Sequence, residues 1–197
     1  VIADTCATYA NAIFDNHESM NSLSLILGAV YFAFQIYGDF SGYSDMALGM
    51  SKLFGIDLLR NFNYPYFSRD IAEFWRRWHI SLSSWFRDYL YIPLGGSSGG
   101  NAMKIRNTFI IFLVSGFWHG ANWTFIAWGF INALYFLPLL LLKKNRSNME
   151  MVSLHRDWSS VKVLLNILST FALTCFAWIF FRAKSIGEAF DYIGRIF

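Results

Sequence analysis

The chain has 197 residues, of which 55% are hydrophobic and only 15% charged, and it includes 8 Trp, 10 Tyr and 21 Phe. Because a soluble chain normally contains about a quarter charged residues, this composition argues against a water-soluble domain and excludes intrinsic disorder, collagen and a coiled coil. Sixteen Lys and Arg against thirteen Asp and Glu give a net charge of +3, too small and too dispersed for a nucleic-acid-binding protein. We therefore predict an all-helical, polytopic membrane protein whose cations lie at a membrane surface.

The ends and the cysteines of the chain bear on its organisation. The first residue is Val1, and no basic segment followed by an apolar stretch and a cleavage site opens the chain, so we expect a fragment of a longer protein. Cys6 and Cys175 lie far apart without a CxxC motif, which supports neither a disulfide framework nor a zinc site. We predict one membrane domain over residues 1–197, with in-plane and short re-entrant helices beside its spans.

Three apolar runs are long enough to cross a membrane, since a spanning helix needs about 20 mostly apolar residues. They are Leu23–Tyr37, Asn122–Leu142 and Val163–Phe181. A fourth run, Asn107–Trp118, is too short to cross alone. Between residues 38 and 101 charged side chains interrupt the apolar ones, so these segments are not ordinary lipid-facing spans.

A helical pattern begins at Asp70. Mostly apolar and aromatic residues recur at offsets of three and four, and polar residues occupy the other face. The first group comprises Trp75, Trp78, His79, Leu82, Trp85, Phe86 and Tyr89. Asp70 suits an N-cap with Glu73 three residues later, and Pro93 ends the pattern. We predict a helix that lies along a membrane interface or lines a cavity walled by protein.

Two later segments are predicted to be connections. Gly95–Asn101 (GGSSGGN) is a flexible loop, because the preceding strand and the Gly-Lys-Ser or Gly-Lys-Thr ending of a phosphate-binding loop are absent. Residues 143–162 carry more Lys and Arg than Asp and Glu, which predicts a cytoplasmic loop. Residues 107–142 then form a hairpin with its turn at residues 116–122. The turn contains His119, and an inbound arm rising only about 18 Å leaves it at membrane depth in non-helical backbone.

The four histidines differ in their surroundings. His17 and His155 lie in polar stretches and are predicted to be solvated loop residues. His79 lies among aromatic residues, a pattern equally typical of a buried histidine bonded to a backbone carbonyl and of a functional one. His119 is a functional candidate by default, because an ionisable group inside a membrane segment is costly. A neutral imidazole, with a reference pKa of about 6.5, suits a general base that takes a proton from an attacking hydroxyl.

Two other chemistries are weaker candidates. Ser115 lacks a GxSxG motif and the strand-to-helix context of a serine nucleophile. Zinc binding by His79 and His119 would require at least a third ligand, for which Asp39 and Asp45 are the candidates. We therefore predict no metal site.

Three motifs follow one another along the chain: QIYGDFSGYSDMALGMSKLFGI from Gln35, NFNYPYFSRDIAEFWRRWHISLSSWFRDYLYIPLGG from Asn61, and FLVSGFWHGANWTFIAWG from Phe112. Together with the opening VIADTCATYANAIFD, they resemble the membrane-bound O-acyltransferase (MBOAT) family, and within it the bacterial, AlgI-like branch of alginate O-acetylation proteins. The match is clearest over residues 34–130.

The resemblance implies a multi-helix membrane enzyme with a central funnel or tunnel, which moves an acyl group onto a hydroxyl. The family's histidine in its WHG motif falls on His119, and its second polar position, a histidine in this branch, falls on His79. The implied roles are a general base for His119 and a group that positions or polarises the acyl carbonyl for His79. Full-length members carry further N-terminal helices.

Four more residues are predicted to contact substrate. As intramembrane or interfacial polar groups they could orient the histidines, bind the phosphates of the acyl donor or pair with other side chains. They are Asp45, Asn63, Arg77 and Trp118.

The resemblance also implies a donor, a partner and a location. It predicts no bound cofactor, an acyl thioester such as acetyl-CoA as donor substrate, and a cell-surface polysaccharide as acceptor. It further predicts an extracytoplasmic SGNH-type acetyltransferase partner, a position in the bacterial cytoplasmic (inner) membrane and no nucleic-acid ligand. Two alternatives are D-alanyl transfer to teichoic acid by a related branch and a non-catalytic membrane channel subunit.

Overall fold

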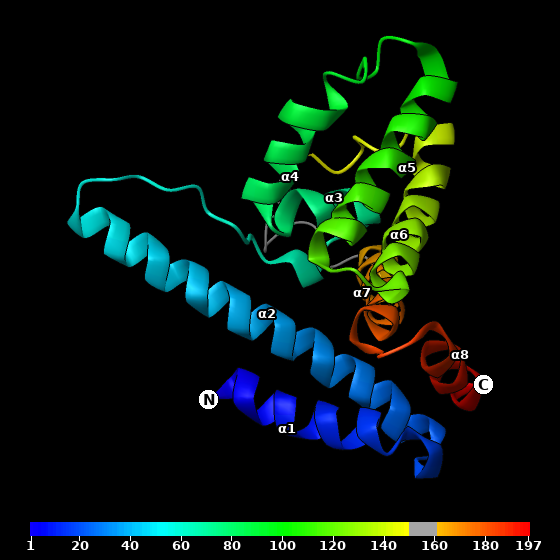
Figure 1. Ribbon diagram of the computed structural model, residues 1–197. Coiled ribbons are helices and arrows are strands. Elements are labelled where there is room, and N and C mark those ends of the chain that lie inside the picture. Colours follow the sequence, from blue (N-terminus) through cyan, green and yellow to red (C-terminus); the bar gives the residue numbers. More distant parts are fainter. Residues whose placement is uncertain (150–160) are drawn as a thin grey trace. The chain divides into compact units, whose positions relative to one another are not determined.

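The computed structural model of the protein describes residues 1–149 and 161–197, and over these residues it contains helices and turns but no strand (Figure 1). The prediction of an all-helical fold is confirmed. The α-helices in chain order are α1 (Ile2–Asp15), α2 (Ser22–Leu53), α3 (Ile71–Arg77), α4 (Ile80–Phe86), α5 (Gly100–His119), α6 (Trp123–Leu141), α7 (Val161–Arg182) and α8 (Ile186–Ile196). One π-helical turn, Arg87–Tyr91, follows α4.

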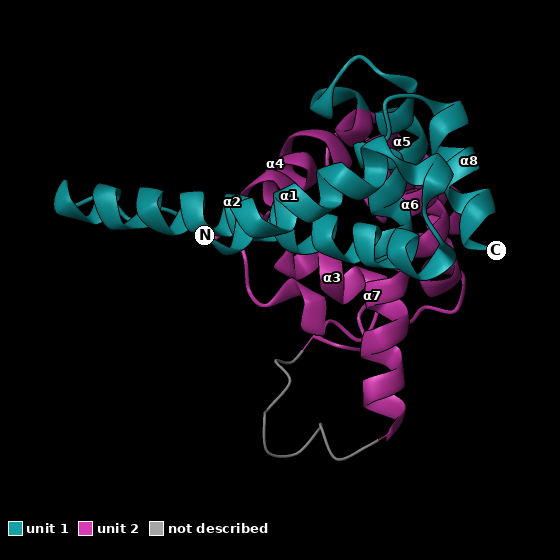
Figure 2. Ribbon diagram, turned by 90° about the horizontal axis from the view of Figure 1, so that it is seen from below, with its two compact units in different colours: residues 1–58, 117–128, 174–197 teal, residues 59–116, 129–173 magenta. Residues whose placement is uncertain are grey.

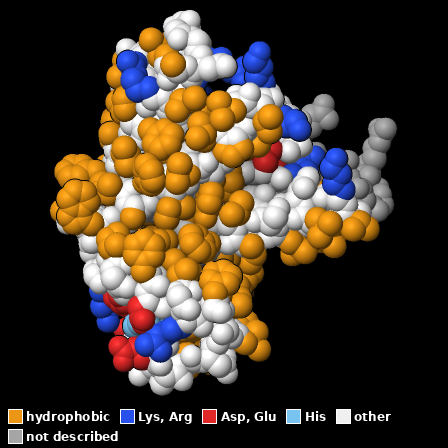
Figure 3. Space-filling view, turned by 90° about the vertical axis from the view of Figure 1, so that its right-hand side faces the viewer, with side chains coloured by type: hydrophobic (Ala, Val, Ile, Leu, Met, Phe, Trp, Pro, Cys, Tyr) orange, Lys and Arg blue, Asp and Glu red, His pale blue; other side chains and the backbone are white. Residues whose placement is uncertain are grey.

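Within the described residues, three helices are long and apolar enough to cross a membrane: α2, α6 and α7. Helices α2 and α7 contain the predicted spans Leu23–Tyr37 and Val163–Phe181, and α6 matches the predicted span Asn122–Leu142 to within one residue at each end. Large apolar side chains on α6 and α7 remain exposed, Phe130 at 46% and Leu165 at 59% among them. The face of the molecule in Figure 3 is covered largely by hydrophobic side chains. Such a surface suits lipid rather than water.

The chain forms two compact units, which are coloured separately in Figure 2. Unit 1 comprises residues 1–58, 117–128 and 174–197, and unit 2 comprises residues 59–116 and 129–173. The expectation of one membrane domain over residues 1–197 stays a prediction, because compact units within one chain are not evidence for or against separate folding.

Unit 1 is built on the antiparallel pair α1 and α2, against which α8 packs. Tyr192 of α8 is only 1% exposed, and its hydroxyl donates a hydrogen bond of 2.7 Å to the carbonyl oxygen of Leu25. Its ring stacks on Phe14 of α1 with 4.4 Å between centroids. Residue 28 is a glycine at this place because the Tyr192 hydroxyl and Ile13 occupy the space that a Cβ would need. One buried tyrosine therefore joins all three helices.

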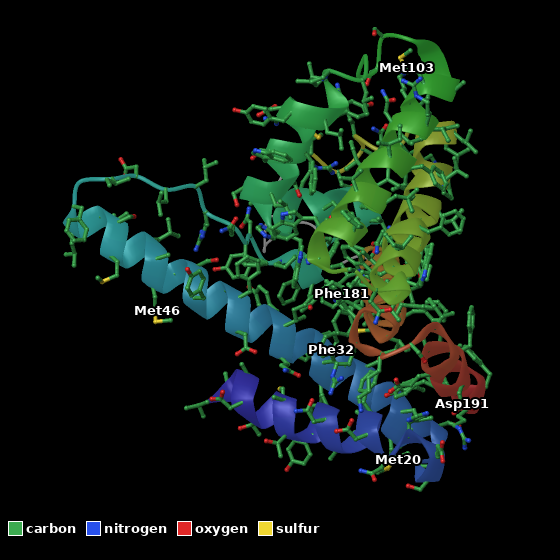
Figure 4. The ribbon with its side chains drawn as sticks, in the orientation of Figure 1. Met20, Phe32, Met46, Met103, Phe181 and Asp191 are labelled. Carbon is green, nitrogen blue, oxygen red and sulfur yellow. The ribbon has the colours of Figure 1, made fainter. Side chains whose placement is uncertain are left out.

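His17 lies at the same end of unit 1, and its predicted solvation is wrong. Its side chain is 13% exposed, its Nε2 lies 3.2 Å from an oxygen of Asp191, and its Nδ1 lies 2.9 Å from the carbonyl oxygen of Phe14. Asp191, labelled in Figure 4, also accepts a hydrogen bond of 2.7 Å from Arg195. Polar neighbours in sequence do not reveal a partner on another helix. His155 lies outside the described residues.

Unit 2 is held together by aromatic rings from distant segments. Trp75 of α3 meets Phe112 of α5 edge to face at 5.3 Å, and Phe74 stacks on Trp78 at 5.5 Å. The backbones of α5 and α6 approach closely, because Gly129 lies against the carbonyl group of Phe112 and leaves no space for a Cβ. These contacts join α3, α5 and α6 in the core of unit 2.

The continuous amphipathic helix predicted from Asp70 onward is wrong, because it is interrupted after Arg77. Trp78 is extended (φ −102°, ψ 127°), His79 is left-handed (φ 46°, ψ 56°), and α4 starts at Ile80. The N-terminal prediction is confirmed: the Asp70 carboxylate accepts a hydrogen bond of 2.7 Å from the backbone N–H of Glu73. The helical spacing of the aromatic residues did not reveal the two-residue break, because aromatic residues continue on the next helix.

Two further boundaries differ from the predictions. Helix α2 does not stop near Tyr37 but continues to Leu53, and α5 starts at Gly100, within the predicted flexible loop. With 20 residues, α5 rises about 30 Å rather than 18 Å. Helix α5 is therefore long enough to traverse the hydrocarbon core, contrary to the prediction. Of the predicted cytoplasmic loop, residues 143–149 form turns, residues 161 and 162 belong to α7, and the rest lies outside the described residues.

Candidate active site

His119 is the last residue of α5 rather than a residue of non-helical backbone, so this part of the prediction is corrected. Three residues, Gly120 to Asn122, separate it from α6. Asn122 links this turn to two other segments: its side-chain oxygen accepts a hydrogen bond of 3.1 Å from the N–H of Thr124 in α6, and its amide donates one of 3.1 Å to the carbonyl oxygen of Lys184, after α7. A helix terminus held in this way gives His119 a fixed position.

The His119 ring packs against a group of four aromatic residues, which we call the aromatic cluster. Its members are Phe125, Trp128, Trp178 and Phe181. The imidazole meets Trp128 and Phe181 nearly at right angles, with ring centroids 5.2 and 5.0 Å away. Trp128 in turn stacks on Trp178 at 5.7 Å, and both are 2% exposed. Phe181, labelled in Figure 4, closes the cluster from α7. All these residues belong to unit 1.

The aromatic cluster suits an imidazole that gains a proton during a reaction. Aromatic rings attract a cation through their quadrupole, by about 0.5–2 kcal/mol per favourable contact. They also exclude water, which strengthens the remaining electrostatic interactions. The glycine after His119 belongs to this design, because the Phe125 ring occupies the place of a Cβ at Gly120.

His79 has a strained backbone. Its φ of +46° is one of three positive values among non-glycine residues of the described ranges. Such a conformation costs about 1–3 kcal/mol and persists only where the surrounding structure enforces it. Strained residues of this kind cluster at active sites. The structure therefore gives His79 a feature that periodicity does not show.

A neighbouring segment enforces the break. The N–H of Asn63 donates to the carbonyl oxygen of Arg77, and the N–H of Ile80 donates to that of Asn61, both at 3.0 Å. Phe62 between them is 6% exposed and meets Trp78 edge to face at 5.0 Å. The backbone of residues 61–63 thus replaces hydrogen bonds that a continuous helix would make.

Burial affects the protonation of His79. Burial lowers the pKa of its imidazole to about 4, because the charged form loses its hydration. The ring is therefore neutral at neutral pH. Since the unfolded chain protonates near pH 6.5 and the folded one near 4, this group lowers the stability as the pH falls from about 6.5 toward 4.

Arg77, a predicted substrate-binding residue, is engaged with a buried carboxylate. Glu73 is 1% exposed, and its oxygens accept hydrogen bonds of 2.6 Å from Arg77 and of 3.0 and 3.1 Å from Arg69. The backbone N–H of Arg69 donates a fourth one of 2.7 Å. The charge of Arg77 thus has an intramolecular partner, and its contact with substrate stays a prediction.

A second polar network on α3 was not predicted from the sequence. Arg76 donates hydrogen bonds of 2.9 Å to the carbonyl oxygens of Asn145 and Asn148. The side chain of Asn148 donates to Asp70, the N-cap of α3. The turn after α6 is thereby bound to both ends of α3. The basic composition of that segment predicted a cytoplasmic loop but gave no sign of this contact.

The other predicted site residues lie in different places. Asp45 is exposed on α2 and Trp118 is 56% exposed on the last turn of α5, both in unit 1. Asn63 is half-buried in unit 2 and contributes its backbone to the His79 break. His119 and His79 belong to units 1 and 2, so their joint action stays a prediction. Within the described residues no three His, Cys, Asp or Glu side chains are grouped as metal ligands.

We expect His79→Gly to be more stable than His79→Ala, by about 1–2 kcal/mol, because glycine adopts a positive φ without steric strain. The measurement is thermal unfolding of both purified full-length variants in the same detergent. As a control, the Gly and Ala variants of Asn101 at the exposed start of α5 should show the opposite order, since alanine is the better helix former. Equal stability of the two His79 variants would contradict the strain.

These features define a polytopic helical membrane protein with a conformationally fixed histidine in each of its two units. A family model described as MBOAT, membrane-bound O-acyltransferase family, matches residues 2–181. The chain therefore belongs to the membrane-bound O-acyltransferase family, as the resemblance of its motifs predicts.

Individual relatives have names that describe related activities. The chain is 40% identical over 197 residues to the peptidoglycan O-acetyltransferase of Helicobacter pylori, covering 96% of this chain and 34% of that protein. It is 41% identical over 198 residues to the "Probable alginate O-acetylase AlgI" of Pseudomonas aeruginosa, covering 100% and 35%. It is 44% identical over 116 residues to the teichoic acid D-alanyltransferase of Streptococcus thermophilus, covering 55% and 28%. The chain spans about a third of the length of these relatives.

Proposed function

We propose that this chain is the histidine-bearing part of a membrane O-acetyltransferase. The enzyme takes an acetyl group from a cytoplasmic thioester such as acetyl-CoA and transfers it to hydroxyls of a cell-surface polysaccharide. The observation that carries the proposal is His119, fixed at the end of α5 against the aromatic cluster within the WHG motif. Family membership and the two relatives named as O-acetyl-transferring proteins support it.

The proposed chemistry assigns a different task to each histidine. The acceptor hydroxyl attacks the thioester carbonyl while His119 takes its proton, and the C–S bond breaks to release the thiol, which recovers that proton from His119. The imidazolium formed on the way is stabilised by the neighbouring rings. His79, held neutral by burial, donates an N–H to the acyl carbonyl oxygen or positions it.

The proposal includes a location and a partner. The protein lies in the bacterial cytoplasmic (inner) membrane, and the acetyl group reaches the polysaccharide with the help of an extracytoplasmic SGNH-type acetyltransferase. The three apolar helices and the bacterial relatives support a membrane location. Asp45, Asn63, Arg77 and Trp118 are proposed to contact substrate, Arg77 through the face not occupied by Glu73.

D-Alanyl transfer to teichoic acid is the second candidate, favoured by one observation. Relatives named teichoic acid D-alanyltransferase also match this chain, at 44% identity over 116 residues for the Streptococcus protein. That branch would take its group from a carrier protein instead of acetyl-CoA. A non-catalytic channel subunit is the third.

A donor test distinguishes the three candidates. Full-length protein in vesicles is incubated with acetyl-labelled acetyl-CoA or with a D-alanyl-loaded carrier protein, and protein- or polymer-bound label is measured. We expect transfer from acetyl-CoA that disappears in the His119→Ala variant. Transfer from the carrier protein alone would replace the acetyl proposal by D-alanyl transfer, and no histidine-dependent transfer from either donor would favour the channel.

A further inference from the structure

We propose that Asn61 is a positioning residue of the acyltransferase site, which caps helix α4 from outside and thereby holds the left-handed backbone from which the His79 side chain projects. The inference rests on the proposed function, because it assigns Asn61 a role that acts through His79. It concerns unit 2 alone and does not depend on how the two units meet.

The need for such a residue follows from the start of α4. The first N–H groups of any helix lack partners within the helix, and the side chain of the N-cap residue normally accepts from one of them. In α4 the N-cap is His79, whose side chain makes no capping hydrogen bond. Histidine is not among the preferred N-cap residues, which are Ser, Thr, Asp and Asn.

Asn61 performs this task, although it lies 20 positions before Ser81 in the chain. Its carbonyl oxygen accepts from the N–H of Ile80 at 3.0 Å, and its Oδ1 accepts from the N–H of Ser81 at 3.2 Å. The same Oδ1 also accepts a hydrogen bond of 2.6 Å from the Ser81 hydroxyl. The first two backbone donors of α4 are thus satisfied by one residue outside the helix.

The arrangement has a consequence for the imidazole. A histidine that had to cap its own helix would direct a ring nitrogen at the backbone of the next turn. Because Asn61 supplies both acceptors, the cap of α4 does not depend on the imidazole, and the left-handed backbone of His79 is held in place. Phe62, buried against Trp78, fixes the segment that carries Asn61.

The test compares Asn61→Ala with Asn61→Asp in the full-length protein. Alanine removes the Oδ1 acceptor, whereas aspartate keeps an oxygen at the same place and suits a helix N-terminus. We expect kcat per folded molecule to fall up to about 100-fold in Asn61→Ala, with the KM for the acyl donor nearly unchanged, because a misplaced group loses transition-state interactions. Asn61→Asp should retain activity within about threefold of the wild type.

Three variants guard against a merely structural effect. Ser81→Ala removes one bond to Oδ1 and keeps the backbone one, so we expect a smaller loss in the same parameter, measurable even if Asn61→Ala fails to fold. Asn101→Ala, an exposed residue at the start of α5, should behave as wild type. In a His79→Gly background, Asn61→Ala should lower the residual activity no further, because the two residues act as one unit.

The outcomes separate the inference from the proposed function. A His79→Gly variant with wild-type activity would remove the role of His79 and the inference with it. An inactive His79→Gly variant beside a fully active Asn61→Ala variant would overturn the inference and leave the proposed function standing. Equal losses in Asn61→Ala and Asn61→Asp, or losses that multiply with that of His79→Gly, would also overturn it.

Discussion

Replacing His119 by alanine in the full-length protein is expected to lower acyl transfer by about 10²- to 10⁴-fold, the usual contribution of a general base. The loss should appear in kcat more than in the KM for the donor, since the proton is taken only as the bond forms. Polymer acetylation in cells and transfer in vesicles both measure it, with the amount of membrane-inserted protein determined in parallel.

His17→Ala is the matched control for this experiment. His17 is also a largely buried histidine of unit 1, but it contacts Asp191 and Phe14 instead of the aromatic cluster. We expect this variant to keep near wild-type transfer. If His119→Ala is inserted normally and still transfers acetyl groups at the wild-type rate, the general-base mechanism is wrong.

Replacing Glu73 by glutamine is expected to destabilise the protein by about 3–5 kcal/mol. The exchange preserves the shape of the side chain but leaves Arg69 and Arg77 facing a neutral group in a site where Glu73 is 1% exposed. Thermal unfolding in detergent measures the effect. We expect Arg69→Gln to be less harmful, because Arg77 still neutralises the carboxylate.

Glu18→Gln provides the comparison, because Glu18 is an exposed residue. Its backbone carbonyl oxygen, and not its carboxylate, accepts the hydrogen bond from Arg195. This variant should unfold within about 0.5 kcal/mol of the wild type. An equal, small effect at both glutamates would show that the Glu73 ion pairs contribute little to stability.

Local composition was sufficient to predict some elements. The spans in α6 and α7 follow from their length and apolar content, and the N-terminus of α3 follows from Asp70 and Glu73. His119 stood out because ionisable groups are rare in apolar segments. These features depend on residues that are neighbours in sequence.

The unpredicted features depend on contacts between distant segments. The break at His79 requires Asn61 and Asn63, the partner of His17 comes from α8, and the turn after α6 reaches Asp70. Periodicity describes one helix at a time and cannot indicate which outside group replaces an internal hydrogen bond. The aromatic cluster was not predicted either, because its members come from α6 and α7, which are far apart in the sequence.

The length of α2 has a consequence for the depth of Asp45 in the bilayer. Its 32 residues extend about 48 Å, whereas the hydrocarbon core is about 30 Å thick. To hide the whole helix, a tilt of about 50° would be needed, beyond the usual range of up to about 40°. About a dozen residues of an upright helix, or about six at a tilt of about 40°, therefore project past the acyl chains. The charged C-terminal end with Asp45 and Lys52 is the end suited to headgroups. A spin label placed near Asp45 should accordingly be reached by water-soluble relaxation agents more readily than by oxygen dissolved in the acyl chains.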